Sequence, residues 1–196
     1  MSWFEVESKS RITNYLILKS KIKQLGVFVK KTVKNDDYYA LFPNNKVSNY
    51  PLKAFRVRYD KSDGSYTINF KKLLKKVSSK EVVVKEEYEF IISDKHGLNN
   101  FFSLIKDLGF SKWITKTKTS EVYEHRKFRG VHLELNRVKG LGDFLEVELL
   151  VNKKSEILGA KRKVLSVLKE LGVIDDVNNT GYTKMLYSKK CRGNNG

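Results

Sequence analysis

The sequence predicts an α+β fold, built from an antiparallel sheet with one charged face and one face covered by helices. Three observations support this prediction. Segments with alternating polar and apolar residues recur along the 196 residues, charged residues fall on one face of several segments, and three stretches show helical spacing. A sheet with a polar concave face and a closed barrel with a polar lumen both fit this pattern.

Ten segments are typical of strands because they alternate or are rich in β-branched and aromatic residues. They comprise residues 4–9, 27–33, 37–42, 54–59, 66–71, 81–93, 113–118, 122–128, 131–137 and 144–151. Pro43-Asn44-Asn45 predicts a turn, and Asp63-Gly64 within residues 60–65 is a hairpin signal. Strands joined by such short turns are antiparallel.

Helices are expected over residues 10–25, 97–108 and 155–171, each followed by a glycine that suits a helix end. For the first helix we expect Gly26 to adopt a positive φ. The basic helix 155–171 can bind membranes or acidic partners, although its apolar stripe favours packing on the core. Residues 181–187 form a short closing segment, and residues 188–196 are expected to be a basic, disordered tail.

The composition narrows the class of protein. The net charge is +17, from 39 Lys and Arg against 22 Asp and Glu, which favours an anionic partner unless the proteome is simply rich in lysine. The single cysteine, Cys191, excludes an intramolecular disulfide, and with only three histidines a Cys/His zinc site is excluded too. No apolar run is long enough to cross a bilayer, so we expect a cytoplasmic protein without a membrane partner.

Paired carboxylates recur on two strands far apart in the sequence. The opening strand places Glu5, Glu7 and Lys9 on one face, because side chains alternate at period two. An apolar core would not accept them, so the face borders either solvent or a charged cavity. Residues 144–151 repeat the pattern with Glu146 and Glu148. Hard oxygen ligands in such pairs suit Mg²⁺ or Mn²⁺.

Cations on other strands could bind phosphate oxygens. The candidates are Arg56, Arg58, Lys71, Lys116 and Lys118. Arginine binds phosphate through two hydrogen bonds and lysine as a point charge, whereas the alternative for each is a cation exposed at the surface. A metal together with a cationic clamp is the arrangement that phosphoryl transfer needs. No Walker-type loop is present, which excludes a P-loop mechanism.

These residues carry a resemblance to a known family. Glu5-x-Glu7-x-Lys9 resembles the opening signature of the CYTH family, also called triphosphate tunnel metalloenzymes. The most specific match is the stretch from Gly140 to Glu148, which is similar to the G-L-G-x-F-x-E-x-E stretch of class IV adenylate cyclases. Further segments match the family in order: Asp37-x-Tyr39, Arg56-Val57-Arg58, Ile68-Asn69-Phe70-Lys71, Glu86-Glu87-x-Glu89, Leu108-Gly109-Phe110, Lys116-x-Lys118 and Gly181-Tyr182.

The resemblance implies an eight-stranded antiparallel barrel that forms a tunnel, with helices outside, over a single CYTH domain of residues 1–187. It implies Mg²⁺ or Mn²⁺ as the cofactor, held by Glu5, Glu7, Glu146 and Glu148. Lys9 and Glu146 would be catalytic. The phosphate-binding residues would be Lys9, Arg56, Arg58, Lys71, Lys116 and Lys118.

The sequence departs from the family pattern at two places. Asn136 stands where the family often has Asp, so one metal or base role is open. The family's K-x-R motif is Lys116-x-Lys118 here, and an alternative register puts Lys118 and Ser120 in its place. Glu87 and Glu89 could pair with the cations or bind metal, and His132 is expected to be structural.

The leading functional prediction is a metal-dependent triphosphatase. Its substrate would be a small triphosphate such as inorganic, nucleoside or thiamine triphosphate, with RNA 5′ ends as a further candidate partner. A class IV adenylate cyclase is the first alternative. A barrel that binds RNA or polyphosphate without turnover is the alternative from another class. The protein would be a monomer or a homodimer.

Overall fold

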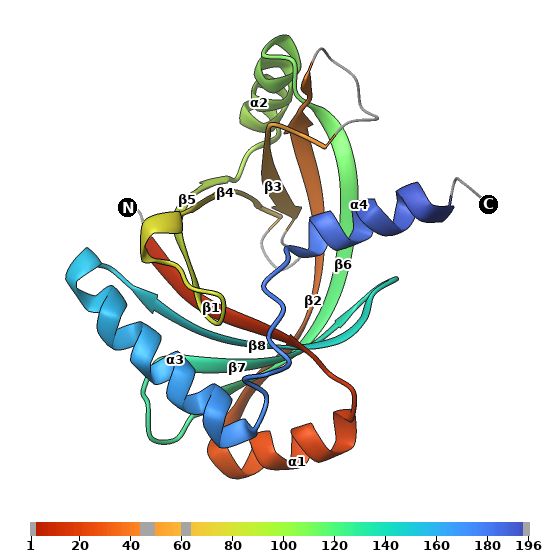
Figure 1. Ribbon diagram of the computed structural model, residues 1–196. Helices are drawn as coiled ribbons and strands as arrows, with labels where there is room; N and C mark the ends of the chain where they lie inside the picture. The colour runs from red at the N-terminus through yellow and green to blue at the C-terminus, as the bar shows by residue number, and fades with distance from the viewer. Residues whose placement is uncertain (1–2, 44–49, 60–63, 194–196) are drawn as a thin grey trace. The chain divides into compact units, whose positions relative to one another are not determined.

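Eight antiparallel strands close into a barrel within residues 3–43, 50–59 and 64–193, which the computed structural model describes. The strands are β1 (Trp3–Arg11), β2 (Gly26–Leu41), β3 (Lys53–Tyr59), β4 (Tyr66–Leu73), β5 (Val83–Ile92), β6 (Ser111–His125), β7 (Val131–Val138) and β8 (Gly142–Val151). Around the barrel the order is β1-β5-β4-β3-β2-β6-β7-β8, so the first and last strands pair with each other (Figure 1). The predicted α+β barrel is confirmed.

Four α-helices accompany the strands in the described residues: α1 (Tyr15–Leu25), α2 (Lys95–Asp107), α3 (Ile157–Leu171) and α4 (Tyr182–Gly193). Helix α1 begins later than predicted because the Asn14 side chain caps it by accepting a hydrogen bond from the Ile17 amide. Asp94 caps α2 in the same way, from the Gly97 amide. Among the described helices, none has the length and apolar character that crossing a membrane requires.

Two strands are longer than predicted. β2 joins the segments predicted at 27–33 and 37–42, and β6 joins those at 113–118 and 122–128. Polar residues such as Asp36 and Ser120 suggested breaks, but both are fully buried and hydrogen-bonded within the strands. A buried polar residue with a partner can stay in a strand, so ten predicted segments become eight strands.

Gly26 does not have the positive φ predicted for it. Its φ is −129°, and it is already the first residue of β2. A Cβ atom at Gly26 would lie 3.1 Å from Cβ of Tyr123 and 3.2 Å from the carbonyl oxygen of Glu124. The glycine is needed for close approach to β6 rather than for a left-handed turn. Gly172 ends α3 as predicted, and it has a left-handed conformation with a φ of 71°.

The end of the chain also differs from the prediction. Helix α4 continues to Gly193, whereas a disordered tail was expected from residue 188. The residues from Ser188 to Gly193 are mostly basic or polar, and for this reason the sequence predicted a disordered tail. Of the predicted turns, residues 44, 45 and 60–63 lie outside the described residues.

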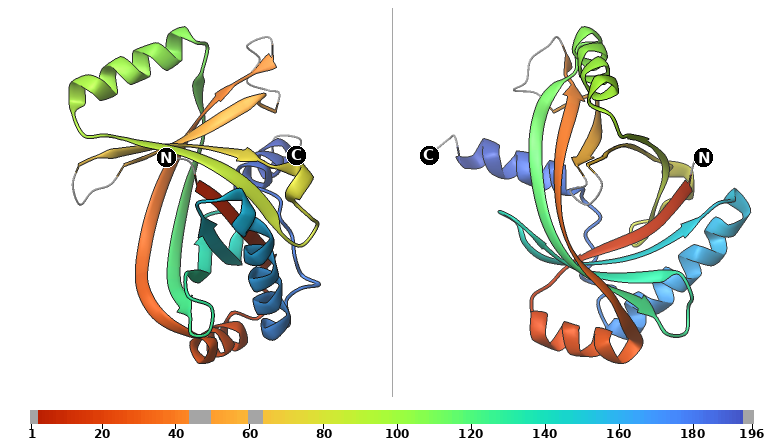
Figure 2. Two further views of the ribbon diagram at one scale, coloured as in Figure 1. Left: turned by 90° about the vertical axis from the view of Figure 1, so that its left-hand side faces the viewer. Right: turned by 180° about the vertical axis from the view of Figure 1, so that it is seen from behind.

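The chain divides into two compact units. The small unit contains residues 34–71 and 88–117, and the large unit contains residues 2–33, 72–87 and 118–196. In the large unit, α3 lies along the face of β1 and β8 (Figures 1 and 2). Its buried residues pack with Val6 and Val147 in one apolar core; they are Ile157, Ala160, Val164, Val167, Leu168 and Leu171.

Because α3 covers the apolar face of β1, the alternate residues of β1 lie on the opposite, polar face. These residues include Glu5, Glu7 and Lys9, and all three are buried. The helix packing therefore fixes which face of the strand carries the charged residues.

Leu168→Ala should lower the free energy of unfolding by about 2–5 kcal/mol, because it removes a fully buried side chain from this core. Leu158→Ala on the same helix is the matched control, since Leu158 is 61% exposed. Urea denaturation measures both variants. Equal losses in the two variants would contradict the assigned orientation of α3.

Candidate metal centre and cation clusters

Three carboxylates of the large unit come together across β1 and β8. Glu5 and Glu7 follow one another on the polar face of β1, and Glu148 lies directly opposite Glu7 in the β1–β8 pairing. One oxygen from each carboxylate lies within 4.8 Å of the others, and Glu5 and Glu7 are buried. Hard, anionic oxygen donors at this spacing fit Mg²⁺ or Mn²⁺.

Lys85 provides positive charge at this acidic cluster. It lies opposite Glu5 in the β1–β5 pairing and contacts both Glu5, at 3.4 Å, and Glu7. Lys85 was not among the residues predicted from the sequence, although it alternates with Glu87 on the same face of β5. The register between β1 and β5, which places it beside Glu5, is visible only in the structure.

Glu146 occupies a different position from the other three predicted metal ligands. Its Oε2 accepts hydrogen bonds from Lys118, at 3.0 Å, and from the Asn136 amide, at 2.7 Å. Its Oε1 lies 3.6 Å from the ammonium of Lys9. Of the predicted ligand set, the acidic cluster contains Glu5, Glu7 and Glu148, while Glu146 lies among cations.

Lys118 bridges two buried carboxylates. Its Nζ donates to Glu134 at 2.7 Å and to Glu146 at 3.0 Å. Burial disfavours the ammonium, but the two carboxylates outweigh this effect and raise the pKa of Lys118 well above its usual value. Lys118 therefore stays charged. Glu134, which was not among the residues predicted from the sequence, is one of its two counter-ions.

Asn136 links β6 to β8 on the same face. Its Oδ1 accepts from the hydroxyl of Ser120 at 2.5 Å, while its Nδ2 donates to Glu146. The position is fully buried. A carboxylate here would add a third negative charge beside Glu134 and Glu146, whereas the amide supplies a donor. Asn136, which departs from the family pattern, therefore uses both the oxygen and the nitrogen of its side-chain amide in hydrogen bonds.

Lys9 is held by residues close to the end of the chain. Its ammonium lies 3.3 Å from the Thr180 carbonyl and 4.1 Å from the centre of the Tyr182 ring. Its backbone accepts from the Asn178 amide and donates to the side chain of Asn179. Burial raises the pKa of Tyr182 well above its usual value, and Glu146 adds to the effect. Tyr182 stays protonated at neutral pH.

His132, expected to be structural, lies beside the acidic cluster. It is directly opposite Glu148 in the β7–β8 pairing, with Nδ1 3.9 Å from Oε1 of Glu148. Interaction with Glu148 raises the pKa of His132 above its usual value.

The small unit contains a second charged cluster, centred on Asp36. The guanidinium of Arg58 donates to both oxygens of Asp36, at 2.6 and 3.0 Å, and Lys116 lies at 2.9 Å. Although burial raises the pKa of Asp36, Lys116 and Arg58 outweigh it and hold the pKa well below the usual value. Asp36 is fully buried, whereas the family resemblance pointed to its neighbour Asp37.

The remaining predicted cations of the small unit lie on β3 and β4. Arg56 is 3.9 Å from Glu89, which also accepts a hydrogen bond from Asn69 at 3.2 Å. Lys71 follows Asn69 by two residues and shares its face of β4. Glu89 is thus paired with a cation, one of the two roles expected for it.

Lys116, Lys118 and Ser120 are all buried at alternate positions of β6. Both registers considered for the K-x-R motif therefore fall on the same face of this strand. Lys116 contacts Asp36 in the small unit, and Lys118 contacts Glu134 and Glu146 in the large unit.

Asp36→Asn should lower the free energy of unfolding at pH 7 by roughly 3–5 kcal/mol, because Arg58 and Lys116 lose a buried counter-ion. The folded pKa of Asp36 is depressed, so its contribution is complete above the unfolded pKa of about 3.9 and is lost as pH falls through the folded pKa. The variant should consequently lose part of the acid dependence of stability.

The neighbouring Asp37→Asn is the control for this prediction. Asp37 pairs with the exposed Lys112, so its replacement should cost no more than about 1 kcal/mol. Denaturant unfolding between pH 7 and pH 3 measures both variants. A larger effect at Asp37 than at Asp36 would refute the assignment.

Comparison with known proteins identifies the family of this chain. The CYTH domain model matches residues 4–180. The PH1819 protein of Pyrococcus horikoshii OT3 has a similar structure, with a TM-score of 0.70 and 28% identity over 94% of this chain and 99% of that one. A conserved hypothetical protein of Pyrococcus furiosus has a TM-score of 0.65 and 30% identity over 92% and 98%.

A curated relative is the protein MJ0240 of Methanocaldococcus jannaschii, which is provisionally named an adenylate cyclase. It is 28% identical over 177 residues, which cover 88% of this chain and 91% of the relative. The family match extends from the opening strand to Thr180, and so includes every residue of the acidic cluster. The chain belongs to the CYTH domain family of triphosphate tunnel proteins.

Proposed function

We propose that this protein is a divalent-metal-dependent hydrolase of triphosphate-containing substrates, such as inorganic, nucleoside or thiamine triphosphate. The observation that carries the proposal is the acidic cluster of Glu5, Glu7 and Glu148, whose oxygens lie within 4.8 Å. Carboxylates at this distance, of which Glu5 and Glu7 are buried, repel one another and favour a bound cation. Membership of the CYTH family supports the same class of substrate.

Glu5, Glu7 and Glu148 would hold Mg²⁺ or Mn²⁺. A divalent cation at this position would supply positive charge to the phosphate oxygens of the substrate. Of the predicted ligands, Glu146 has cationic and amide partners instead, and we assign it a catalytic role next to the metal ligands.

Lys9 and Glu146 are the residues that we propose to act on the reacting atoms. Lys9 binds an oxygen of the phosphoryl group that is transferred, and Glu146, 3.6 Å away, orients the attacking water and accepts its proton. The new bond joins the water oxygen to the terminal phosphorus, and the bond to the bridging oxygen breaks. The products are phosphate and the shortened polyphosphate.

The other phosphate-binding assignments rest on the family resemblance. Arg56, Arg58, Lys71 and Lys116 would bind phosphate oxygens, and Arg58 and Lys116 would do so while partly neutralised by Asp36. Lys118 would bind phosphate while it neutralises Glu134 and Glu146.

Cyclisation of ATP is the second candidate reaction. The name of the Methanocaldococcus jannaschii relative favours it, as does the similarity of residues 140–148 to class IV adenylate cyclases. In that reaction the ribose 3′-hydroxyl would replace water as nucleophile, and cyclic AMP and pyrophosphate would be the products. RNA 5′ ends are a further candidate substrate, and binding of RNA or polyphosphate without turnover is the non-enzymatic alternative.

Purified protein with Mg²⁺ or Mn²⁺ should release phosphate from inorganic triphosphate, ATP, thiamine triphosphate or RNA with a 5′-triphosphate. Glu5→Gln should lower kcat by roughly 100-fold or more, because it removes one charged oxygen from the cluster without changing its shape. Phosphate release, cyclic AMP and Mn²⁺ binding are measured in parallel.

Glu86→Gln is the control for that variant, since Glu86 pairs with the exposed Lys72 at 3.8 Å and lies outside the cluster. Formation of cyclic AMP in place of phosphate would establish the cyclase instead. Full turnover by Glu5→Gln, or no Mn²⁺ binding by the unaltered protein, would refute the metal centre.

Lys85→Gln should raise the affinity for Mn²⁺ by roughly tenfold, because the Lys85 ammonium repels a second cation at the Glu5 and Glu7 carboxylates. Isothermal titration measures the affinity without any substrate. Lys72→Gln removes the same charge beside Glu86 and should leave the affinity nearly unchanged. Weaker Mn²⁺ binding by Lys85→Gln would show that Lys85 positions the carboxylates instead.

A further inference from the structure

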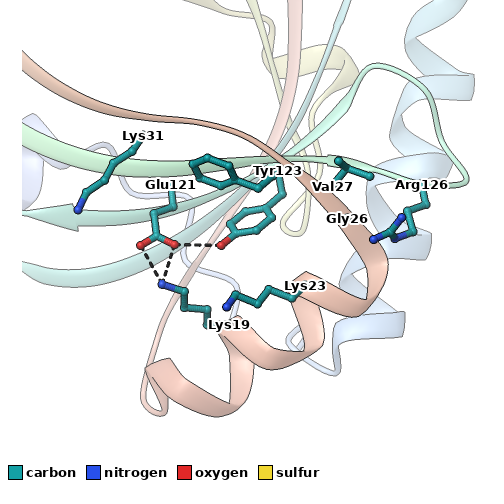
Figure 3. Close-up of a pocket in the computed structure, with 9 residues that line it drawn as sticks. Lys19, Lys23, Gly26, Val27, Lys31, Glu121, Tyr123 and Arg126 are labelled. Carbon is teal, nitrogen blue, oxygen red and sulfur yellow. Dashed lines mark hydrogen bonds and ion pairs between the residues drawn. The ribbon is translucent and has the colours of Figure 1, made fainter.

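The large unit has a pocket that is separate from the acidic cluster. It has a volume of about 490 Å³ and lies between α1, the start of β2 and the end of β6 (Figure 3). None of the residues proposed above to bind metal or phosphate lines it. The lining residues are Lys19, Lys23, Gly26, Val27, Phe28, Lys31, Glu121, Tyr123 and Arg126.

The pocket has a surplus of positive charge. Its one acid, Glu121, is hydrogen-bonded by Lys19 at 2.8 Å and by the hydroxyl of Tyr123 at 3.0 Å. The hydrogen bond from Lys19 lowers the pKa of Glu121, which is therefore ionised and balanced by Lys19. Lys31 adds to that effect from further away. Three exposed cations, Lys23, Lys31 and Arg126, exceed what the single carboxylate neutralises, and this surplus favours an anionic ligand.

One wall of the pocket is apolar. Val27 and Phe28 are 51% and 53% exposed, and the Phe28 ring meets the ring of Tyr123 edge to face, with centroids 5.5 Å apart. Burial raises the pKa of Tyr123 to about 12, so its hydroxyl remains a donor to Glu121. Inorganic phosphate would leave this apolar surface exposed to water, whereas a ligand with a flat ring would cover it.

We propose that this pocket binds a nucleotide unit, with the base against Phe28 and the phosphate among Lys23, Lys31 and Arg126. An aromatic surface combined with several cations is the combination that binds single-stranded nucleic acid, through stacking and phosphate contacts. The nucleotide can be free or part of single-stranded RNA, and the net charge of +17 gives RNA the longer-range attraction. The proposal is independent of the hydrolase, because the pocket and the acidic cluster share no residue.

Two fluorescent probes test the proposal by anisotropy, in EDTA so that no metal bridges the probe to the carboxylates. One is a 5′-hydroxyl RNA of about 12 nucleotides, which carries no triphosphate. The other is a labelled mononucleotide. Phe28→Leu, which keeps an apolar side chain but removes the ring, should weaken binding by roughly tenfold.

Lys23→Gln combined with Arg126→Gln should also weaken binding, and should reduce the slope of log affinity against log salt by about 0.7 for each lost phosphate contact. Lys163→Gln with Lys169→Gln on α3 is the control, because it removes the same charge from an exposed surface elsewhere. Thermal unfolding establishes that every variant is folded.

Binding of both probes, each lost in the Phe28 variant, supports a site for free nucleotides. Binding of the RNA alone, with the same loss, supports a site on single-stranded RNA. No binding of either probe would overturn the proposal, as would equal losses in the α3 control, which would indicate diffuse attraction. Unchanged turnover of triphosphate in the Phe28 variant would show that the two sites are separate.

Discussion

The charged face of the large unit depends on pairing each buried charge with an opposite one. The ammonium of Lys118, between the carboxylates of Glu134 and Glu146, is the clearest case. Neither carboxylate could be ionised at its buried position without a cation within hydrogen-bond distance. The interaction also joins β6 to β7 and β8 through side chains, in addition to the ladder of backbone hydrogen bonds. Lys85 pairs in the same way with Glu5 and so links β5 to β1. In the small unit, Asp36 of β2 pairs with Arg58 of β3 and Lys116 of β6. Each of these charged residues has a partner of opposite charge on a neighbouring strand.

The same constraint explains which parts of the site the sequence could predict. Alternation at period two was sufficient to put Glu5, Glu7 and Lys9 on one face, since it depends on a single strand. The partners Lys85, Glu134 and Asp36 were not found, because pairing between strands depends on register, which one strand does not contain. Asp37 was named only because Asp37-x-Tyr39 resembles a family motif. Only the contacts with Arg58 and Lys116 identify the buried member of the pair.

The fold was predictable to a similar extent. Local patterns located the helices and most strand segments, while the resemblance to the CYTH family supplied the number of strands and the closure of the barrel. The errors lie where tertiary contacts decide the outcome. The buried and paired Asp36 and Ser120 let β2 and β6 continue through stretches that suggested breaks, and Gly26 is extended because Tyr123 lies against it. Helix α4 has few apolar residues, and a polar helix of this kind has no strong periodic signal in sequence.

The contacts of Lys9 with residues near position 180 affect the order in which the site forms during synthesis. Its backbone partner Asn179 is 170 residues further along the chain, and Thr180 and Tyr182 follow directly. The ribosome therefore delivers the lysine first and the residues that orient it among the last of those described. At 5–20 residues per second, a typical rate of translation, roughly 10–30 seconds separate the two. β8, which contributes Glu148 and pairs with β1, is synthesised shortly before these residues, so the acidic cluster is completed first and the contacts of Lys9 follow, both late in translation.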